Sequence, residues 1–296
     1  MFAEWERWLV ERDRSVQTVR LYVSDVRRFR EWFEARNGER WDPGRVTGLD
    51  VREWRRGLVE RVSPATVNRK LAALRSFYAW QIETGVLDSS PLVGIRQVRV
   101  QRSAPRWLDR AEQRRVVRAL EIAVQGAQSE RGRWRALRDR AMVGLMLHAG
   151  LRVAEVAGAQ VRHLSLRARS GTLTVEGKGR KWRTVPLNAS ARAGLRGWLE
   201  VRPAGDALFV SQKGGGIDAS SVWRRVAAIG ARARVEGLTP HRLRHSCGKE
   251  LVDAEVPLNY VAEVLGHSRL ETTAIYTRPS AGDLERMMER VAWVDS

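Results

Sequence analysis

The segment that most limits how this chain can fold is "SPATVNRKLAALRSFYAWQIETG", which has the pattern of one amphipathic helix over residues 63–85. Ser63 is a typical N-cap, Pro64 suits the first helical position, and Gly85 suits the position just beyond a helix end. Apolar residues recur every three or four positions between them, at Val67, Leu71, Leu74, Tyr78 and Ile82. A helix of this kind needs partners that cover its apolar face.

A second amphipathic helix is predicted from Ser15 onward, because apolar residues recur there with helical spacing. They are Val19, Tyr22, Val23, Val26, Phe29 and Phe33. No strand pattern occurs before residue 90, so we expect residues 1–95 to form a small all-helical bundle. Residues 96–106 are rich in arginine, include a proline and lack a sustained period, which is typical of an interdomain linker that can also contact phosphates.

The second domain, expected over residues 107–296, mixes helices with a β-hairpin. Asp109 and Glu112 have the spacing of a capping box before another apolar helix. In "GTLTVEGKGRKWRTVPL", two alternating runs flank a Gly-Lys-Gly turn, which predicts a hairpin with Lys178 at its tip. This turn does not match a phosphate-binding loop, because glycine rather than serine or threonine follows the lysine and no helix comes next.

The net charge indicates a polyanionic partner. Lysine and arginine number 53 against 34 aspartate and glutamate residues, a formal charge of +19. This surplus exceeds what solubility requires and favours nucleic acid. A coding bias toward arginine is the alternative, since only five of the cations are lysine. Such a bias explains which cation is used but not the excess.

Nothing in the sequence indicates secretion or a membrane. Cys247 is the only cysteine, so an internal disulfide is impossible and the reducing cytoplasm is the expected location. The N-terminus alternates apolar and charged residues, unlike a signal peptide. The longest apolar stretch is well short of the ~20 residues that cross a bilayer.

The segment "TPHRLRHS" predicts an anion site at a helix N-terminus. Thr239 and Pro240 suit the N-cap and the first helical position. His241 and Arg244 would then share one face within the first two turns, where anions are favoured. A zinc pair of His241 and His245 is one alternative, although no other ligand accompanies it and the arginines would repel a cation. A solvated helix surface is another.

Two further segments carry candidate functional groups. In "VPLNYVAEVLGHSRLETTAIYT", a helix over residues 257–265 ends at Gly266, and His267 lies in the turn before a short helix capped by Ser268. Tyr276 comes near the end of that short helix. Taken alone, His267 would more often be a turn residue and Tyr276 a packed aromatic.

In "HAGLRVAEV", Gly150 suits a helix end, and Arg152 begins the next helix with Glu155 one turn later. A buried structural pair of Arg152 and Glu155 is the alternative to a functional arginine.

Together these groups have the chemistry for attack on a phosphodiester. Guanidinium groups match phosphate oxygens with paired hydrogen bonds and so stabilise a pentavalent phosphorus without a metal. A tyrosine hydroxyl has an ordinary pKa of ~10, so it needs a base or a cationic pocket to become a nucleophile at neutral pH. A leaving alkoxide needs a proton, which a lysine can donate.

The segments "AGLRVAEV", "GKGRKWRTVPL", "TPHRLRHS" and "VLGHSRLETTAIYT", in this order, resemble the tyrosine recombinases of the phage-integrase family, most closely the Xer-type recombinases and small integrases. "SPATVNRKLAALRSFYAW" resembles the helical core-binding domain of that family, so the resemblance covers nearly the whole chain. It implies a mainly α fold with a small β-hairpin or sheet. An N-terminal SAM-like core-binding domain would precede a C-terminal α+β catalytic domain.

By this resemblance the catalytic residues are Arg152, Lys178, His241, Arg244, His267 and Tyr276. Tyr276 would be the nucleophile, the others would form the phosphate pocket, and His245 would be structural. After "HRLRHS" this chain reads "CGKEL", where Xer proteins usually have a run of small and aromatic residues. We expect that difference to change local packing without touching the pocket.

The resemblance further implies a C-shaped clamp on double-stranded DNA at a specific recombination site. Tyrosine attack would give a 3′-phosphotyrosine and a free 5′-hydroxyl, and the hydroxyl of a partner strand would reverse the step. Because the ester conserves the bond energy, neither ATP nor a metal cofactor is expected. Strand exchange would take a homotetramer, or a tetramer with a paralogue, on two sites. The sequence does not distinguish chromosome dimer resolution from movement of a mobile element.

Three other functions are compatible with parts of the sequence. A type IB topoisomerase-like enzyme shares the chemistry, although the helical first domain and the short chain argue against it. A non-catalytic duplex DNA-binding protein would have no use for an intact Tyr276 and Lys178. A metal-dependent nuclease needs a carboxylate cluster, which the sequence does not contain.

The segment "SAGDLERMMERVAWV" predicts a last amphipathic helix, capped by Ser280, within residues 281–296. Its apolar positions are Leu284, Met287, Met288 and Val291. The helix would either pack on its own domain or, as the resemblance suggests, dock on a neighbouring protomer.

Overall fold

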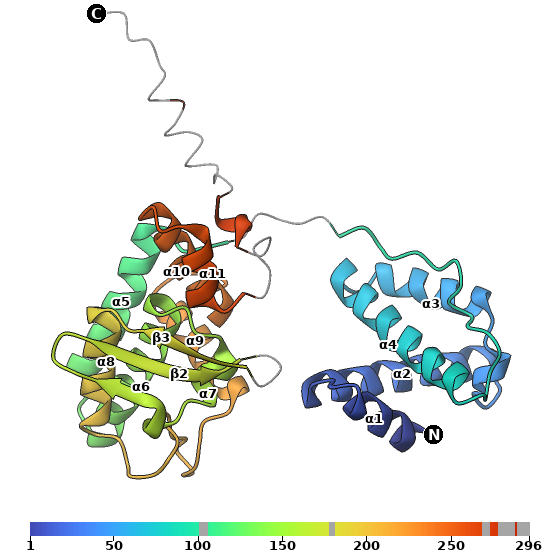
Figure 1. Ribbon diagram of the computed structural model, residues 1–296, viewed down its shortest axis with the longest axis horizontal. Helices are drawn as coiled ribbons and strands as arrows, with labels where there is room; N and C mark the ends of the chain where they lie inside the picture. The colour runs from blue at the N-terminus through green and yellow to red at the C-terminus, as the bar shows by residue number, and fades with distance from the viewer. Residues whose placement is uncertain (101–105, 178–180, 268–272, 278–287, 289–296) are drawn as a thin grey trace, which may run out of the picture. The chain divides into compact units, whose positions relative to one another are not determined.

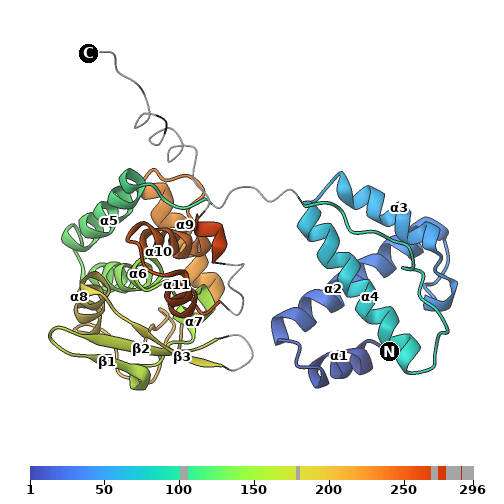
Figure 2. The same ribbon diagram turned by 45° about the horizontal axis from the view of Figure 1, so that its top comes forward.

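The computed structural model describes residues 1–100, 106–177, 181–267, 273–277 and 288. The chain divides into two compact units, residues 1–103 and 104–296, each with its own apolar core (Figures 1 and 2). Within the described ranges, none of the helices has both the length and the apolar character needed to cross a membrane.

The first unit is all-helical over its described residues, as the sequence predicts. Its helices are α1 (Phe2–Glu11), α2 (Val16–Asn37), α3 (Gly48–Val59) and α4 (Pro64–Glu83), with a 3-10 turn, η1, at Pro43–Arg45. Ser15 and Ser63 are the N-caps of α2 and α4, and each side chain accepts a backbone N–H three residues on. The predicted starts of both helices are therefore confirmed.

Aromatic side chains form much of the core of this unit. Phe77 of α4 meets Trp5 of α1 edge-on with ring centroids 5.2 Å apart, and Phe29 of α2 meets Trp54 of α3 in the same way at 5.0 Å. The prediction that Ile82 belongs to the buried stripe of α4 is wrong, because Ile82 is 39% exposed. It lies in the last turn of the helix, on a face other than that of the buried Trp80 and Gln81.

The segment after α4 packs back on this helix. The side chain of Asn68 donates to the carbonyl of Val98 and accepts the N–H of Val98, both at 2.8 Å. Arg75 donates to the carbonyl of Ile95 at 2.6 Å. The first residues of the segment expected to be a linker, 96–106, are thus held on the first unit.

The helices of the second unit gather around α6. Their bounds are α5 Arg110–Gln125, α6 Glu130–His148, α7 Val153–Ala157, α8 Ala189–Leu199, α9 Ala219–Arg232, α10 Pro240–Asp253 and α11 Leu258–Leu265, with 3-10 turns η2 at Val161–His163 and η4 at Ala274–Thr277. Helix α6 packs against α5, α8 and α10 and is buried over most of its second half. The predicted capping box of α5 is confirmed, with Asp109 and Glu112 each accepting the N–H of the other residue.

A three-stranded antiparallel sheet lies along one side of the second unit, with the helices on its other side (Figure 2). Its strands are β1 (Leu164–Leu166), β2 (Gly171–Glu176) and β3 (Trp182–Pro186), in that spatial order. The predicted hairpin is confirmed as β2 and β3, in which Leu173 pairs with Val185 and Val175 with Arg183. Strand β1 was not predicted, because its three residues are too few to show an alternating pattern.

Some predicted features lie outside the described residues. They are the hairpin tip with Lys178, the short helix capped by Ser268, and the last helix over 281–296 apart from Met288. The predicted end of α11 is described and confirmed, since Gly266 has the left-handed backbone (φ 62°) of a helix C-cap.

A buried ion cluster joins α2 to α4. Asp25 is 2% exposed and accepts hydrogen bonds from Lys70 Nζ at 2.9 Å and from Arg69. Lys70 itself is only 4% exposed, so its ammonium group depends on this carboxylate to replace lost hydration.

Asp25→Ala is expected to lower the free energy of unfolding by about 3–5 kcal/mol, because it leaves the Lys70 ammonium buried without its counter-charge. Urea unfolding followed by tryptophan fluorescence measures the change. Glu31→Ala, at an exposed carboxylate of the same helix, is the control and should stay within about 0.5 kcal/mol of the unsubstituted protein. Equal losses from both substitutions would contradict this account of the cluster.

Candidate active site

The turn between α6 and α7 places the first arginine of the site. Gly150 has φ 64°, and a Cβ there would lie 2.5 Å from Leu265 Cδ2, so both backbone and space require glycine. Arg152 follows this turn as the N-cap residue of α7. The backbone N–H of Arg152 donates to Glu155 Oε2 at 2.7 Å. Gly150 and Arg152, which the sequence analysis identified, therefore lie in one tight turn between α6 and α7.

Glu155 is a buried carboxylate shared by two arginines. It is 5% exposed and accepts from Arg152 Nη1 at 2.8 Å and from Arg183 Nη1 and Nη2 at 2.5 and 2.9 Å. Burial alone would raise the pKa of Glu155, but the hydrogen bonds from Arg183 and Arg152 outweigh burial and lower it. The carboxylate therefore stays ionised at neutral pH and fixes both guanidinium groups.

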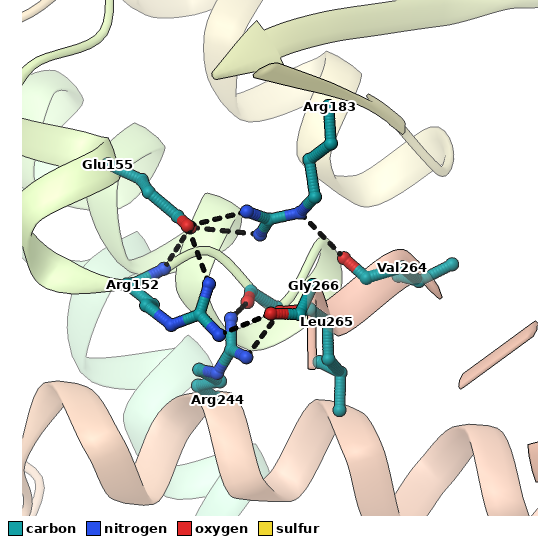
Figure 3. A network of polar contacts seen from close by, with 8 residues as sticks. Arg152, Glu155, Arg183, Arg244, Val264, Leu265 and Gly266 are labelled. Carbon is teal, nitrogen blue, oxygen red and sulfur yellow. Dashed lines mark hydrogen bonds and ion pairs between the residues drawn. The ribbon is translucent and has the colours of Figure 1, made fainter. Parts of the chain in front are cut away.

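The end of α11 is held by three arginines from three different segments (Figure 3). Arg183, Arg244 and Arg152 donate to the carbonyl oxygens of Val264, Leu265 and Gly266, respectively. The last carbonyls of a helix have no partner within it and carry partial negative charge. The guanidinium groups satisfy these oxygens, so the site and the end of α11 stabilise each other.

Arg244 is the most deeply buried of these arginines, at 4% exposure. It lies in the second turn of α10, and its Nη1 also donates to the carbonyl of Gly150 at 2.5 Å. Burial and the nearby charge of Arg152 lower its pKa to about 10, so it still carries a full positive charge at neutral pH.

The histidines beside these arginines are neutral at pH 7. Burial, followed by the charges of Arg244, Arg152 and Arg183, lowers the pKa of His267 to about 4. Burial and the charges of Arg244 and Arg152 also lower the pKa of His241. The site thus combines fixed cations with uncharged hydrogen-bonding groups, an arrangement that suits an anion such as phosphate.

His267, which follows the end of α11, is held in one orientation by its hydrogen bonds. Its backbone N–H donates to the carbonyl of Ala262 at 2.9 Å, and its Nδ1 lies 2.9 Å from the hydroxyl of Thr273, which is fully buried. Its ring lies nearly parallel to that of Tyr276, with centroids 6.3 Å apart.

Tyr276 lies in η4 with its side chain only 1% exposed. Its Oη is 2.8 Å from Nδ1 of His245, and Nε2 of His245 is 2.6 Å from Nε2 of His241. Burial raises the pKa of Tyr276 to about 12, and the charge of Arg244 offsets this only in part. The hydroxyl is therefore protonated in the free protein.

Gly248 provides the space for the tyrosine ring. A Cβ at this position would lie 2.6 Å from Tyr276 Cζ and 3.0 Å from Leu265 Cδ1. Gly248 belongs to the "CGKEL" run that differs from the Xer pattern, and it lies directly against Tyr276. The expectation that this run does not touch the site is therefore wrong.

The structure brings together five of the six site residues predicted from the sequence: Arg152, His241, Arg244, His267 and Tyr276. Lys178 lies outside the described residues. In the part of the chain that the structure describes, no group of three histidine, cysteine or acidic side chains is arranged to hold a metal ion.

Two residues of the site were not recognised from the sequence. Arg183 occupies an inward position of β3, two residues before the buried Val185, and a charge at such a position requires a partner. That alternation was a usable signal. His245 was expected to be structural, yet its ring lies between His241 and Tyr276.

The chain matches the model of the phage integrase family over residues 107–282 and that of the phage integrase N-terminal SAM-like domain over residues 2–85. It is 37% identical over 241 residues to tyrosine recombinase XerC of Serratia marcescens, covering 80% of this chain and 74% of the relative. Tyrosine recombinase XerC of Pseudomonas fluorescens is 34% identical over 276 residues, covering 90% and 87%.

Solved structures share the fold at lower identity. The XerH site-specific recombinase bound to its difH substrate, in a pre-cleavage complex, has a TM-score of 0.71 at 22% identity, covering 97% of this chain and 84% of that one. A lambda integrase dimer bound to a COC′ core site has a TM-score of 0.71 at 17% identity, covering 99% and 96%.

Gly248→Ala is expected to displace the ring of Tyr276, because the added methyl group overlaps it. In the unsubstituted protein, a reagent that nitrates exposed phenols should modify Tyr260, which is 57% exposed, well before Tyr276. In the variant, Tyr276 should react at least about tenfold faster, as measured by peptide mass spectrometry. The rate at Tyr260 is the internal control.

Gly144→Ala, a helical glycine with open space around its Cβ position, is the matched substitution and should leave Tyr276 protected. Protection of Tyr276 in the Gly248 variant would contradict the packing described for its ring.

Proposed function

The chain belongs to the phage integrase family of site-specific tyrosine recombinases, and we propose that Tyr276 is the nucleophile with which it breaks and rejoins DNA strands. Tyr276 attacks a phosphodiester, forms a 3′-phosphotyrosine and releases a 5′-hydroxyl. The hydroxyl of a partner strand then attacks the ester and regenerates the tyrosine. The bond energy is kept in the ester throughout.

One observation carries this proposal: the hydroxyl of Tyr276 lies within the electrostatic influence of Arg244 and Arg152, two of three clustered arginines that share the carboxylate of Glu155 or the end of α11. A phosphodiester carries the negative charge that would balance this excess of positive charge. As the tyrosine oxygen approaches phosphorus, charge on the phosphate oxygens grows, and Arg152 and Arg244 are the donors that stabilise it. His241 and His267 supply neutral hydrogen bonds beside them.

The general acid of the proposed reaction is Lys178, which lies between β2 and β3 in the sequence. The departing 5′ oxygen requires a proton, and an ammonium group can donate one without a metal. Arg183 of β3, the strand that follows this segment in the sequence, donates to Glu155, which supports a role for the hairpin at the site.

The remaining parts of the proposal concern DNA and assembly. Residues 1–95 are proposed as a core-binding domain and 96–106 as the linker, so that both units engage the same double-stranded recombination site. The net charge of +19 supports a polyanion such as duplex DNA as the partner. Four protomers on two sites would exchange strands, and the cytoplasm, where duplex DNA is found, is the proposed location.

Tyr276→Phe is expected to abolish the covalent protein–DNA adduct and leave DNA affinity within a few-fold, because only the phenolic oxygen is removed. The preferred duplex is first selected from a randomised DNA library. A nicked version of this duplex then traps the adduct, because the short strand with the free 5′-hydroxyl diffuses away after cleavage. The reaction contains EDTA, and the adduct is detected on a denaturing gel. An adduct that persists in this variant would place the nucleophile elsewhere.

The same assay separates the other functions. A non-catalytic DNA-binding protein forms no adduct, and a metal-dependent nuclease cleaves nothing in EDTA. A type IB topoisomerase-like enzyme forms the adduct but yields no recombinant strands from two sites. Tyr260→Phe, at an exposed tyrosine, is the control and should form the adduct normally.

Lys178→Ala is expected to slow cleavage of an ordinary phosphodiester by about 100-fold or more, because the departing alkoxide loses its proton donor. A substrate with sulfur at the bridging 5′ position should be cleaved at nearly the rate of the unsubstituted protein, since a thiolate leaves without a proton. Single-turnover rates on both substrates measure this. Equal slowing on both would exclude Lys178 as the general acid.

A further inference from the structure

His241, His245 and Gly248 lie in sequence along one face of α10, at spacings of four and three residues. Tyr276 packs over Gly248 and directs its hydroxyl back to His245. The contacts therefore form a line: Tyr276 Oη to His245 Nδ1 at 2.8 Å, then His245 Nε2 to His241 Nε2 at 2.6 Å. Both ring nitrogens of His245 are used.

The number of hydrogens on this line is fixed by chemistry. Two Nε2 atoms in contact share one proton, so one imidazole donates and the other accepts. When the phenol of Tyr276 donates to Nδ1 of His245, the hydrogen of His245 must lie on Nε2 and point to His241. His241 then accepts at Nε2 and carries its own hydrogen on Nδ1. In this arrangement each hydrogen points from the tyrosine toward His241; the opposite tautomers, in which His241 donates to His245 and His245 donates to Tyr276 Oη, fit the same two contacts.

We propose that His245 is a further catalytic residue, which takes the proton of Tyr276 at Nδ1 and passes its Nε2 proton to His241 as the tyrosine attacks phosphorus. This inference rests on the proposed function, since it assigns the base for the same nucleophile. The inference gives the His245 ring, which lies between Tyr276 and His241, a role beyond packing.

The step balances in atoms and charge. The bond from Tyr276 Oη to phosphorus forms as the bond from phosphorus to the 5′ oxygen breaks, and that oxygen takes a proton from the general acid. The phenolic proton goes to His245, the proton of His245 goes to His241, and His241 becomes an imidazolium beside the phosphate. Rejoining runs each transfer backward.

The free protein does not make this transfer. Burial, followed by His241, Arg244 and His267, lowers the pKa of His245 to about 4, while burial raises that of Tyr276 to about 12. A bound phosphate adds negative charge where Arg244 and Arg152 now disfavour imidazolium. DNA binding therefore makes the transfer more favourable, and the nucleophile forms only with substrate in place.

His245→Asn and His245→Phe separate proton transfer from positioning. An asparagine amide oxygen can accept the phenolic hydrogen in place of Nδ1 but is not a base, whereas phenylalanine fills the space alone. We expect both variants to cleave the nicked duplex about 100-fold or more slowly than the unsubstituted protein, with DNA affinity within a few-fold. Single-turnover adduct formation and thermal unfolding are measured for each.

The pH profile is the readout that a structural role would not move. Without the internal base, the phenol of the Asn variant must ionise in solution, so its cleavage rate should rise by about tenfold per pH unit from neutral pH toward its pKa. The unsubstituted protein should change far less over that range. Glu250→Gln, at an exposed carboxylate of α10, is the control and should keep the profile of the unsubstituted protein.

Two outcomes overturn the inference. Cleavage by the Asn variant within about threefold of normal would show that a hydrogen-bond acceptor is sufficient. A slow Asn variant with an unchanged pH profile would show that His245 only positions the tyrosine. In both cases the adduct still forms through Tyr276, whereas failure of the proposed function means that the unsubstituted protein forms no Tyr276-dependent adduct.

Discussion

Three guanidinium groups of like charge share one small region of the second unit, and the site depends on what holds them together. Two unit charges ~5 Å apart repel by roughly 3 kcal/mol at an effective dielectric constant of 20. Glu155 supplies one full negative charge, and the end of α11 supplies a row of carbonyl oxygens that its own helix leaves without partners. These acceptors offset part of the repulsion and leave a net positive site.

Burial and that positive surplus together set the protonation states of the other groups. The pKa of His267 is lowered first by burial and then by the nearby arginines, since a further cation would add to their repulsion, so the ring stays neutral. The tyrosine stays protonated because burial outweighs the attraction of Arg244. The positive field therefore adds to the effect of burial in keeping the histidines of the site uncharged.

The sequence predicted what depends on neighbours along the chain. Helix caps at Ser63 and Asp109, and the glycine that ends α11, were recognisable because capping is local chemistry. The short strand β1 could not be recognised, since its pairing with β2 supplies the order that its own residues do not encode. The prediction for Ile82 was wrong because helical spacing alone does not show which side of the last turn is covered, and there Trp80 and Gln81 are the buried residues.

The sequence predicted which residue types form the site, but not the contacts between them. Residue types and spacing indicated arginines, histidines and a tyrosine, and the resemblance grouped them. The roles of Arg183 and His245 depend on contacts with residues 28 and 31 positions away, respectively, which spacing within one segment cannot show. Alternation in β3 would have identified Arg183 as an inward charge.

The order of the segments along the chain has a consequence for synthesis. Arg152, Arg183 and Arg244 all precede the carbonyl oxygens of residues 264–266 that receive them. While a ribosome is still translating α11, these carbonyl oxygens have not yet been made, so the three arginines lack acceptors that hold them in the complete chain. The cluster of three arginines therefore cannot reach its final arrangement until the chain has been made at least as far as Gly266.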